Sequence, residues 1–439
     1  MTNLLSLLIL EIIIFSLAFL FSDRDVLSPT CIMCAMFVVS TIFALLNVSQ
    51  WKVDFGFSSL MIISSGLLVA VITELFCKSL WQRNNTISEE KSCNHSISIR
   101  NYVVILFIAF NLVVSYLYFR AIRSIVGNSS SVGIMFAMYR NMGVDDLAGR
   151  ATERVGGLLN QLLKVTKATG YVGIYVLIYN IVNSGKEKIK QNYLLGILCV
   201  TSLLHAVMIA SRGGILMYLS NILIVYYVLW HQKKGWGRNL SWKVIRYGII
   251  GIIIGIPIFY YSAFLIGRKN TLNIMDYVST YIGGSIVLFD LYLKDPIPAT
   301  QFGEESLYNF KKIFNTLGFG NASTSYNLES RYLGNIRSNV YTFFRRPLHD
   351  FGLFGMYIFT ILVIVLFCWI YYKKIKWRPR TTKTDCWVLI YGYLYYWMFV
   401  SSILQYSVSY VSFGCLTTIA IILALYLFIT KVRLKFGGS

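Results

Sequence analysis

Charged side chains are scarce in this sequence. They make up 13% of its 439 residues, about half the share of a soluble domain, whereas 56% of the residues are hydrophobic. A soluble core of this length could not bury so much apolar surface, but a bilayer can. Long segments that alternate in polarity, as barrel strands do, are lacking. We therefore predict an all-α fold, a polytopic integral membrane protein with about 11 transmembrane helices.

Soluble domains, low-complexity linkers and internal repeats are also lacking, so we expect a single transmembrane domain over residues 1–439. The apolar segments that predict the spans are 4–21, 27–47, 57–77, 102–119, 168–183, 193–210, 213–230, 244–266, 350–372, 386–405 and 410–430. The first of them has neither a basic segment before it nor a small-residue cleavage site. We expect it to be a retained helix and not a signal peptide.

Acidic residues are few, and the formal net charge is +21. Such an excess of positive charge can indicate nucleic acid as a partner, but here the basic residues lie between apolar segments and form no single patch or arm. In a membrane protein they more often set the topology and contact anionic lipid. We expect membrane lipid, and no nucleic acid, among the partners.

The short loops differ in their basic residues, which predicts the orientation of the chain. The segment 373–385 is rich in Lys and Arg, and 406–409 has none. We therefore place 373–385 and the C-terminus in the cytoplasm. The odd number of spans then leaves the N-terminus outside.

Metal and redox motifs are weak. Cys31 and Cys34 form a C-x-x-C pair without a second pair or a thioredoxin-like context, so we interpret both as small apolar residues inside a helix. The only D-x-D is Asp23-Arg24-Asp25, which we interpret as charges at the ends of helices. We expect no metal site and no cofactor.

Two long segments fall on the outer face in this topology, the first at 120–167 and the second at 267–349. Both are rich in Arg, whose planar fork suits phosphate and carboxylate. In the second, apolar residues at helical spacing over 307–317 predict a short amphipathic helix at the membrane interface, and aromatic residues around Gly283–Gly284 predict another. These loops favour an anionic substrate with a lipid tail, although a basic surface facing lipid headgroups explains part of the pattern.

Candidate chemistry concentrates at the ends of spans. Arg212 stands in the turn Ser211-Arg212-Gly213-Gly214, where it either binds an anion or extends to the interface. The segment 339–355 places Arg345, Arg346, His349 and Asp350 at the outer mouth of a span. Asp350 could be a charge favoured by the helix dipole or a general base.

These motifs resemble the Wzy-type oligosaccharide repeat-unit polymerases, the O-antigen polymerase family. The resemblance covers residues 160–430 and rests on three short segments in the same order. The segments are Ser211-Arg212-Gly213-Gly214, Tyr281-Ile282-Gly283-Gly284-Ser285, and Asn339-Val340-Tyr341-Thr342 followed by Asp350-Phe351-Gly352. The paired Arg-x10-Gly motifs of some members are lacking, so a capture model built on them does not transfer.

The resemblance implies a glycosyltransferase of surface-polysaccharide biosynthesis that acts at the periplasmic face of the bacterial inner membrane. The chain would cross this membrane several times, with its N-terminus in the periplasm. Donor and acceptor would be oligosaccharides linked to undecaprenyl pyrophosphate, and a chain-length regulator protein is a candidate partner. The pyrophosphate would be bound by Arg212, Arg268, Arg345 and Arg346. Other substrate contacts would come from Tyr281, Gly283, Gly284, Asn339 and Tyr341. Asp350 would be the base or would orient it, and His349 is the second choice, because imidazole ordinarily titrates near neutral pH.

Three alternatives remain open at the level of the sequence. An O-antigen ligase would use the same donor and transfer the glycan to lipid A core. A lipid-linked oligosaccharide flippase would be a transporter, although the long second loop is unlike one. A scaffold without catalytic activity would not need Arg212 at the end of a span.

Overall fold

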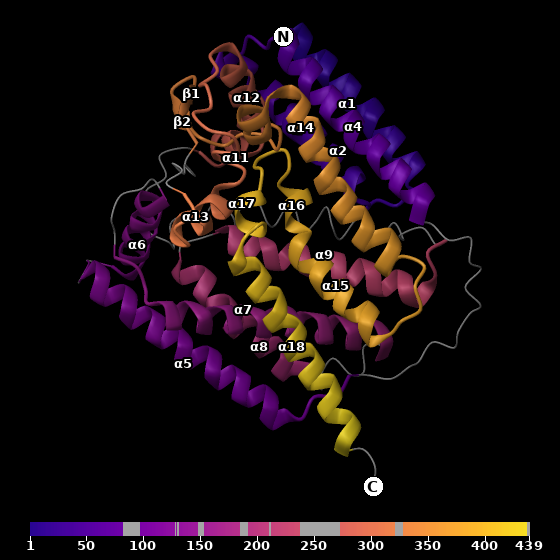
Figure 1. Cartoon of the computed structure of the whole chain (residues 1–439), viewed down its shortest axis with the longest axis vertical. Helices are drawn as coiled ribbons and strands as arrows, with labels where there is room; N and C mark the ends of the chain where they lie inside the picture. The colour runs from indigo at the N-terminus through magenta and orange to yellow at the C-terminus, as the bar shows by residue number, and fades with distance from the viewer. Residues whose placement is uncertain are drawn as a thin grey trace. The chain divides into compact units, whose positions relative to one another are not determined.

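The structure is a computed structural model that describes residues 1–81, 97–127, 129, 131–147, 153–184, 192–209, 212–237, 273–320 and 328–436. Over these residues the chain consists of helices, connecting turns and a single two-stranded hairpin (Figure 1). The prediction of an all-α fold is confirmed.

Eight helices in the described ranges are long and apolar enough to cross a membrane. They are α1 (Thr2–Phe21), α2 (Pro29–Leu46), α4 (Phe57–Trp81), α5 (Asn101–Val126), α7 (Gly157–Ser184), α9 (Arg212–Lys234), α14 (Arg345–Cys368) with the π-helix Trp369–Ile375 that continues it, and α18 (Phe413–Phe436). Each coincides with a predicted span. Many of their apolar side chains are exposed, as expected for surfaces that face lipid. The protein is therefore a multi-pass membrane protein.

Three predicted spans are not found as long helices. The span at 193–210 is a shorter helix, α8 (Tyr193–Met208), and the span at 244–266 lies outside the described residues. The prediction of one continuous helix over 386–405 is wrong. There α15 (Thr382–Leu394) is followed by the short α16 (Tyr396–Phe399), then by turns and by α17 (Ser407–Tyr410).

Polar groups explain this interruption. Ser401, Ser402 and Gln405 are buried, and each takes part in a hydrogen bond to a residue outside 386–405. The carbonyl of Ser401 accepts a hydrogen bond from the N–H of Phe343, and the hydroxyl of Ser402 bonds to that of Ser40. Irregular backbone is tolerated at membrane depth where such bonds satisfy it inside the protein.

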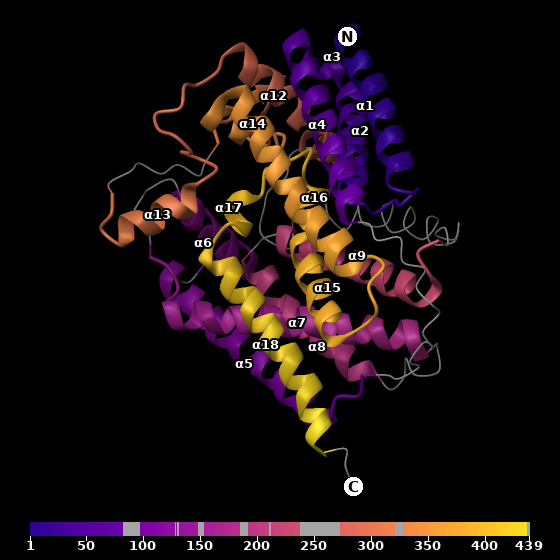
Figure 2. The same cartoon turned by 45° about the vertical axis from the view of Figure 1, so that its right-hand side comes forward.

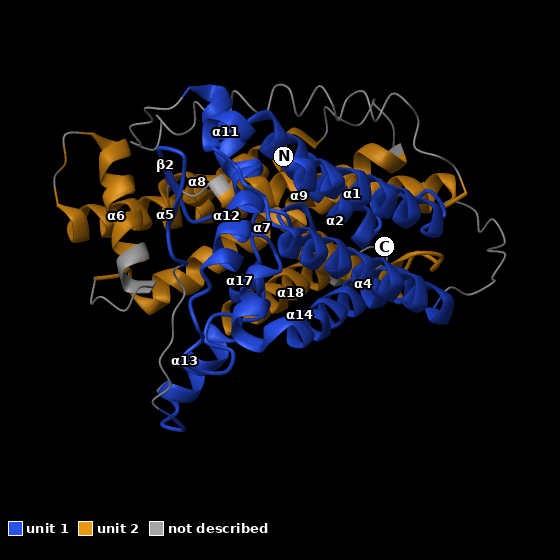
Figure 3. Ribbon diagram, turned by 90° about the horizontal axis from the view of Figure 1, so that it is seen from above, with its two compact units in different colours: residues 1–82, 271–373, 397–412 blue, residues 83–270, 374–396, 413–439 orange. Residues whose placement is uncertain are grey.

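The chain divides into two compact units, coloured separately in Figure 3. Unit 1 contains residues 1–82, 271–373 and 397–412. Its helices α1, α2, α4 and α14 pack against one another, and a short helix, α3 (Val48–Trp51), follows α2. In Figures 1 and 2, α1 runs alongside α4. Because both units contain spanning helices, the expected single transmembrane domain remains a prediction.

Unit 1 also holds the second long loop, which is largely structured. It forms α11 (Ile274–Ile282), α12 (Gly284–Lys294), α13 (Tyr308–Thr316) and a hairpin of β1 (Arg331–Leu333) and β2 (Ile336–Ser338). The hairpin turns at Gly334, whose φ of +59° favours glycine. Helix α13 forms where helical spacing predicts it, and it leaves the side chains of Phe310, Phe314 and Leu317 exposed.

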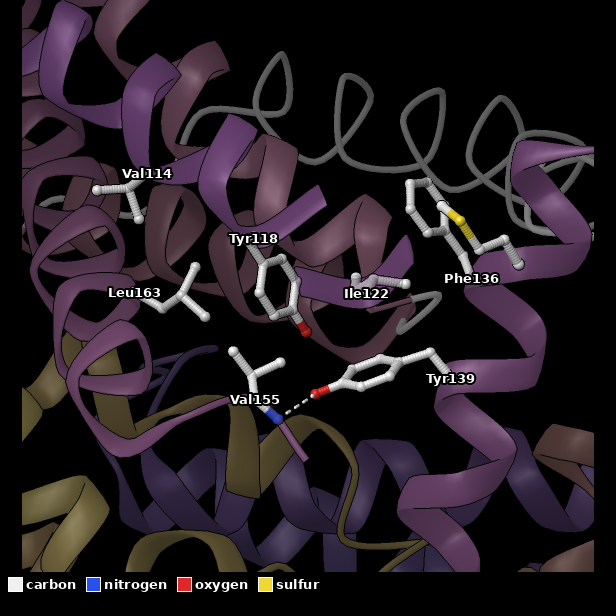
Figure 4. Close-up of a cluster of buried hydrophobic side chains, with 8 residues drawn as sticks. Val114, Tyr118, Ile122, Phe136, Tyr139, Val155 and Leu163 are labelled. Atoms are coloured by element: carbon white, nitrogen blue, oxygen red, sulfur yellow. Dashed lines mark hydrogen bonds between the residues drawn. The ribbon is translucent and has the colours of Figure 1, made fainter. Parts of the chain in front are cut away.

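Unit 2 contains residues 83–270, 374–396 and 413–439. Helix α7 is central, because it packs against α5, α8, α9, α15 and α18. Helix α5 continues to Val126 and α7 begins at Gly157, so both helices extend into the residues predicted as the first long loop. Between them, α6 (Val132–Leu147) joins α5 and α7 in an apolar cluster that includes Tyr118, Phe136 and Leu163 (Figure 4).

Candidate active site at the start of α14

The first residues of α14 form a short segment that a kink separates from the rest of the helix. Gly352 has φ +68° and ψ −173°, a conformation open essentially only to glycine. A side chain at Gly355 would collide with Phe351, so the turn after the kink also needs a small residue. The segment before the kink carries Arg345, Arg346, His349 and Asp350, and places them inside unit 1.

Arg345 is the centre of a buried ion-pair network. Its side chain is 1% exposed, and its guanidinium bonds to the carboxylate of Glu305 and, at 2.5 Å, to that of Glu329. The ring of Tyr292 lies 4.5 Å from the guanidinium carbon. A buried charge requires such partners, and two carboxylates more than balance one guanidinium. Arg345 is thus placed to hold Glu305 and Glu329, and its predicted pyrophosphate contact stays untested.

Asp350 bonds to backbone. One carboxylate oxygen accepts a hydrogen bond from the N–H of Glu305 at 3.0 Å, and the other accepts from the N–H of Ser306 at 2.5 Å. Both oxygens are therefore committed to the chain just before α13. Asp350 is predicted to be the base or to orient it. This geometry favours the second role, because the carboxylate fixes the backbone of Glu305, which lies beside His349.

His349 lies between a tyrosine and two carboxylates. Its Nδ1 is 3.3 Å from the hydroxyl of Tyr292, within hydrogen-bond distance. Its Nε2 is 3.7 Å from Glu305 Oε1 and 3.9 Å from Glu304 Oε2, too far for a hydrogen bond to either. If Nδ1 carries the proton and donates a hydrogen bond to the hydroxyl of Tyr292, Nε2 is left as a hydrogen-bond acceptor beside two carboxylates. The side chain of His349 is only 4% exposed, so a substrate hydroxyl that donates to this nitrogen must first displace the residues that cover it.

The surroundings keep the neighbouring groups in defined protonation states. Burial raises the pKa of the Tyr292 hydroxyl; the nearby Arg345 opposes this effect and Glu305 adds to it. The hydroxyl thus remains protonated at neutral pH. Burial alone would raise the pKa of Glu304, but hydrogen bonds from the N–H and hydroxyl of Thr300, both 2.9 Å, outweigh it and lower the pKa. Glu304 is thus held as a carboxylate.

An open pocket lies next to this network. It has a volume of about 410 Å³ and is lined by Leu291, Asp295, Ile297, Glu329, Ser330, Arg331 and Tyr332. Glu329 belongs to both features, since it binds Arg345 and lines the pocket. Arg331 spans the pocket wall by donating to the backbone carbonyl of Leu291 at 2.8 Å. The ring of Tyr332 is exposed, and it could stack against a sugar. The carboxylates and the arginine beside it could form hydrogen bonds with the hydroxyls of that sugar.

The other predicted contact residues have mixed placements. Tyr341 is buried beside Arg345 and donates to the carbonyl of Glu329 at 3.0 Å, whereas Asn339 is exposed. Tyr281 is half-buried against Tyr277. Arg346 is buried, with Nε 4.0 Å from Glu305 Oε2.

The glycine pair Gly283–Gly284 serves helix packing. A side chain at Gly283 would lie 2.5 Å from the backbone nitrogen of Ala44, and one at Gly284 would lie 2.6 Å from Leu333 Cδ1. Both glycines therefore allow close approach of α11 and α12 to their neighbours. The substrate contacts predicted for them remain untested, and the packing explains their small size without substrate.

The side chains of two predicted arginines, Arg212 and Arg268, are not described. Arg268 lies outside the described residues, and so does Ser211, which precedes Arg212 in the sequence. Of Arg212 only the backbone is described, as the first residue of α9, and a Cβ at the nearby Gly214 would lie 3.0 Å from Ala206 Cβ. Their predicted pyrophosphate contacts stay predictions.

Sequence reasoning offered Glu305, Glu329 and Tyr292 no special role. In the sequence, Glu305 and Glu329 are two of several outer-loop carboxylates, 40 and 16 residues from the arginine that binds them. No local motif links these positions. The pair Arg345–Arg346 directly before an apolar span could have pointed to them, because arginines that are buried at such a place require carboxylate partners.

No protein family, characterised protein or solved structure matches this chain in comparisons with known proteins.

Proposed function

We propose that this protein polymerises oligosaccharide repeat units linked to undecaprenyl pyrophosphate, by glycosyl transfer at the periplasmic face of the bacterial inner membrane. The product would be O-antigen or a related surface polysaccharide. The observation that carries the proposal is the setting of His349, a buried imidazole whose Nε2 lies near two carboxylates without a hydrogen bond to either, at the mouth of an apolar helix.

The proposed reaction needs a proton acceptor. The acceptor hydroxyl attacks the anomeric carbon of the donor, a C–O bond forms, and the bond to the pyrophosphate breaks. The proton of the hydroxyl moves to Nε2 of His349, and Glu304 and Glu305 stabilise the imidazolium that results. Tyr292 accepts the hydrogen bond from Nδ1 and fixes the ring.

The leaving pyrophosphate keeps the electron pair of the broken bond, so positive groups must stabilise it. Arg212 and Arg268 keep this role from the sequence pattern. Arg345 contributes indirectly, because it positions Glu305 and Glu329. The pocket beside Tyr332 would hold sugars of the acceptor unit.

Complementation tests the proposal. In a strain that lacks this gene, the wild-type chain should restore a ladder of polymers on lipid A core. His349→Gln should leave the core capped with a single repeat unit, at unchanged protein level in the membrane. Lys233→Met is a matched control, because among the described residues Lys233 bonds to the carbonyls of Val182 and Asn183 in unit 2 and not to the candidate site.

The single-unit cap also separates the proposed function from the alternatives. A ligase defect would leave the core without any cap, and a flippase defect would keep undecaprenyl-linked units in the cytoplasmic leaflet. Either result for His349→Gln would contradict the proposal, as would a full ladder.

A further inference from the structure

Two lysines of α7 point into the interior of unit 2. Lys164 donates a hydrogen bond to the hydroxyl of Thr417 on α18 at 2.9 Å, and Lys167 donates to the hydroxyl of Tyr393 on α15 at 3.5 Å. Residues three apart lie on one face of a helix, so the two ammonium groups share that face. Each ammonium group therefore contacts a neighbouring helix of its own unit and does not extend freely toward the membrane surface.

Neither lysine has a carboxylate partner among the described residues. In unit 2 the described carboxylates with described side chains are Glu153, which is exposed, and Asp385. Asp385 accepts from Tyr426 at 2.7 Å and lies 3.4 Å from Arg380 Nε. Asp385 lies away from the two lysines, because its partner Tyr426 packs on Tyr175. Tyr175 follows Lys167 by about two turns of α7. Arg345, in contrast, is balanced by two glutamates.

The helices around Lys167 hold it in place. Its ammonium lies 4.8 Å from the ring centre of Tyr393, and its backbone carbonyl accepts from the hydroxyl of Tyr218 at 3.1 Å. A side chain at Gly170, in the next turn, would collide with Ser202 and Tyr218. The close packing of α8 and α9 on α7 therefore depends on this glycine, and it presents Lys167 from a rigid surface.

The depth of the pair suits a lipid headgroup. Lys164 and Lys167 follow the first residue of α7 by roughly 10 and 15 Å along a helix of about 42 Å. A bilayer with its headgroups is about 40–45 Å thick, with a hydrocarbon core of about 30 Å. The two ammonium groups would then lie a few ångströms below the headgroups. Positive charge at this depth is costly, and where it is retained it usually marks a functional site.

We propose that Lys164 and Lys167 form a binding site for the phosphate group of a membrane lipid. The phosphate supplies the missing negative charge, and the tyrosines around Lys167 exclude water from the contact. Two sources have this chemistry, a polyprenyl pyrophosphate and bulk anionic phospholipid. Polyprenyl pyrophosphate as the physiological lipid rests on the proposed function, whereas the site itself does not.

Lipid binding to the full-length chain tests the site. The protein is placed in nanodiscs of zwitterionic phosphatidylcholine, and three probes are titrated: undecaprenyl pyrophosphate, phosphatidylglycerol and inorganic pyrophosphate. The double substitution Lys164→Met and Lys167→Met should lower the affinity for undecaprenyl pyrophosphate about tenfold or more, since each lysine near the surface contributes on the order of tenfold or slightly less. Lys167→Arg should retain most of the affinity, and Lys233→Met should retain all of it.

The probes separate the two sources. A loss confined to undecaprenyl pyrophosphate identifies the polyprenyl lipid, and an equal loss for phosphatidylglycerol identifies bulk phospholipid; both support the site. Equal affinity of the wild-type and double-substituted chains would overturn it, as would an equal loss in Lys233→Met. Retained binding in a protein that makes no polymer would leave the site standing and reject the proposed function. Methionine preserves the length and apolar packing of lysine, and an unchanged thermal midpoint confirms the fold.

Discussion

His349 and Asp350 are neighbours in the sequence, yet the structure gives them different surroundings. Asp350 bonds only to backbone N–H groups in the described chain, whereas Nε2 of His349 lies near Glu304 and Glu305 without a hydrogen bond to either. The sequence could identify the pair, because both lie at the mouth of a span beside two arginines. It could not assign their roles, since the groups that decide them come from the chain more than 40 residues earlier.

Substitutions should separate these two roles. His349→Gln should reduce the polymerisation rate by about 10²–10⁴-fold with little change in stability, because it removes a proton acceptor. Asp350→Asn should also lower the free energy of unfolding by about 1–3 kcal/mol. The amide N–H₂ of Asn would face a backbone N–H, and it cannot accept a hydrogen bond from that donor. Polymerisation rates and thermal unfolding of both variants are measured together. A stable Asp350→Asn variant with the activity loss of His349→Gln would return the role of base to Asp350.

The pairing of Arg345 with two glutamates gives a second expectation at this scale. Arg345→Met alone should destabilise the protein by about 3–5 kcal/mol, because the buried carboxylate of Glu305 would lose its nearest counter-charge and keep, among the described residues, only Arg346, 4.0 Å away. Adding Glu305→Gln should recover part of the loss. A double-mutant cycle on unfolding free energies measures the coupling. Additive losses would show that the two side chains do not interact.

The elements show where hydrophobicity predicts structure and where it does not. Eight spans can be predicted from the apolar runs alone, because an apolar helix of that length is most stable when it crosses the hydrocarbon core of a bilayer. The run at 386–405 is equally apolar in outline, but Ser401 and Ser402 bond to Phe343 and Ser40, which are remote in the sequence. Hydropathy cannot anticipate such partners. The kink in α14 is different, since its glycine is visible in the sequence.

This kink predicts the effect of a substitution. Gly352→Ala should destabilise unit 1 by about 1–3 kcal/mol, because a Cβ is strained at φ +68° and ψ −173° even where space is open. Gly196→Ala is the control, as Gly196 lies inside α8 with ordinary φ and no atom near its Cβ. Alanine should be neutral or stabilising there. Equal thermal midpoints for both variants would show that the backbone at Gly352 is not strained.

At the scale of the whole molecule, the spanning helices establish a membrane protein, and the Lys and Arg of its short loops predict its orientation. Cysteines introduced at Ser129 and Ser323 should react with an impermeant thiol reagent in spheroplasts, whereas the native Cys93 should not. The other native cysteines are replaced by serine or alanine for the measurement. Labelling of Cys93 alone would invert the topology and move the candidate active site to the cytoplasmic face.

The most direct measurement is polymerisation by the purified chain. Undecaprenyl-linked single repeat units are isolated from a strain that lacks this gene and are incubated with the protein in liposomes. The account predicts a stepwise ladder of longer glycans, one undecaprenyl pyrophosphate released for each unit added, and neither with His349→Gln. Intact single units that cross the bilayer without elongation would contradict the account, and so would glycan transferred only to added lipid A core.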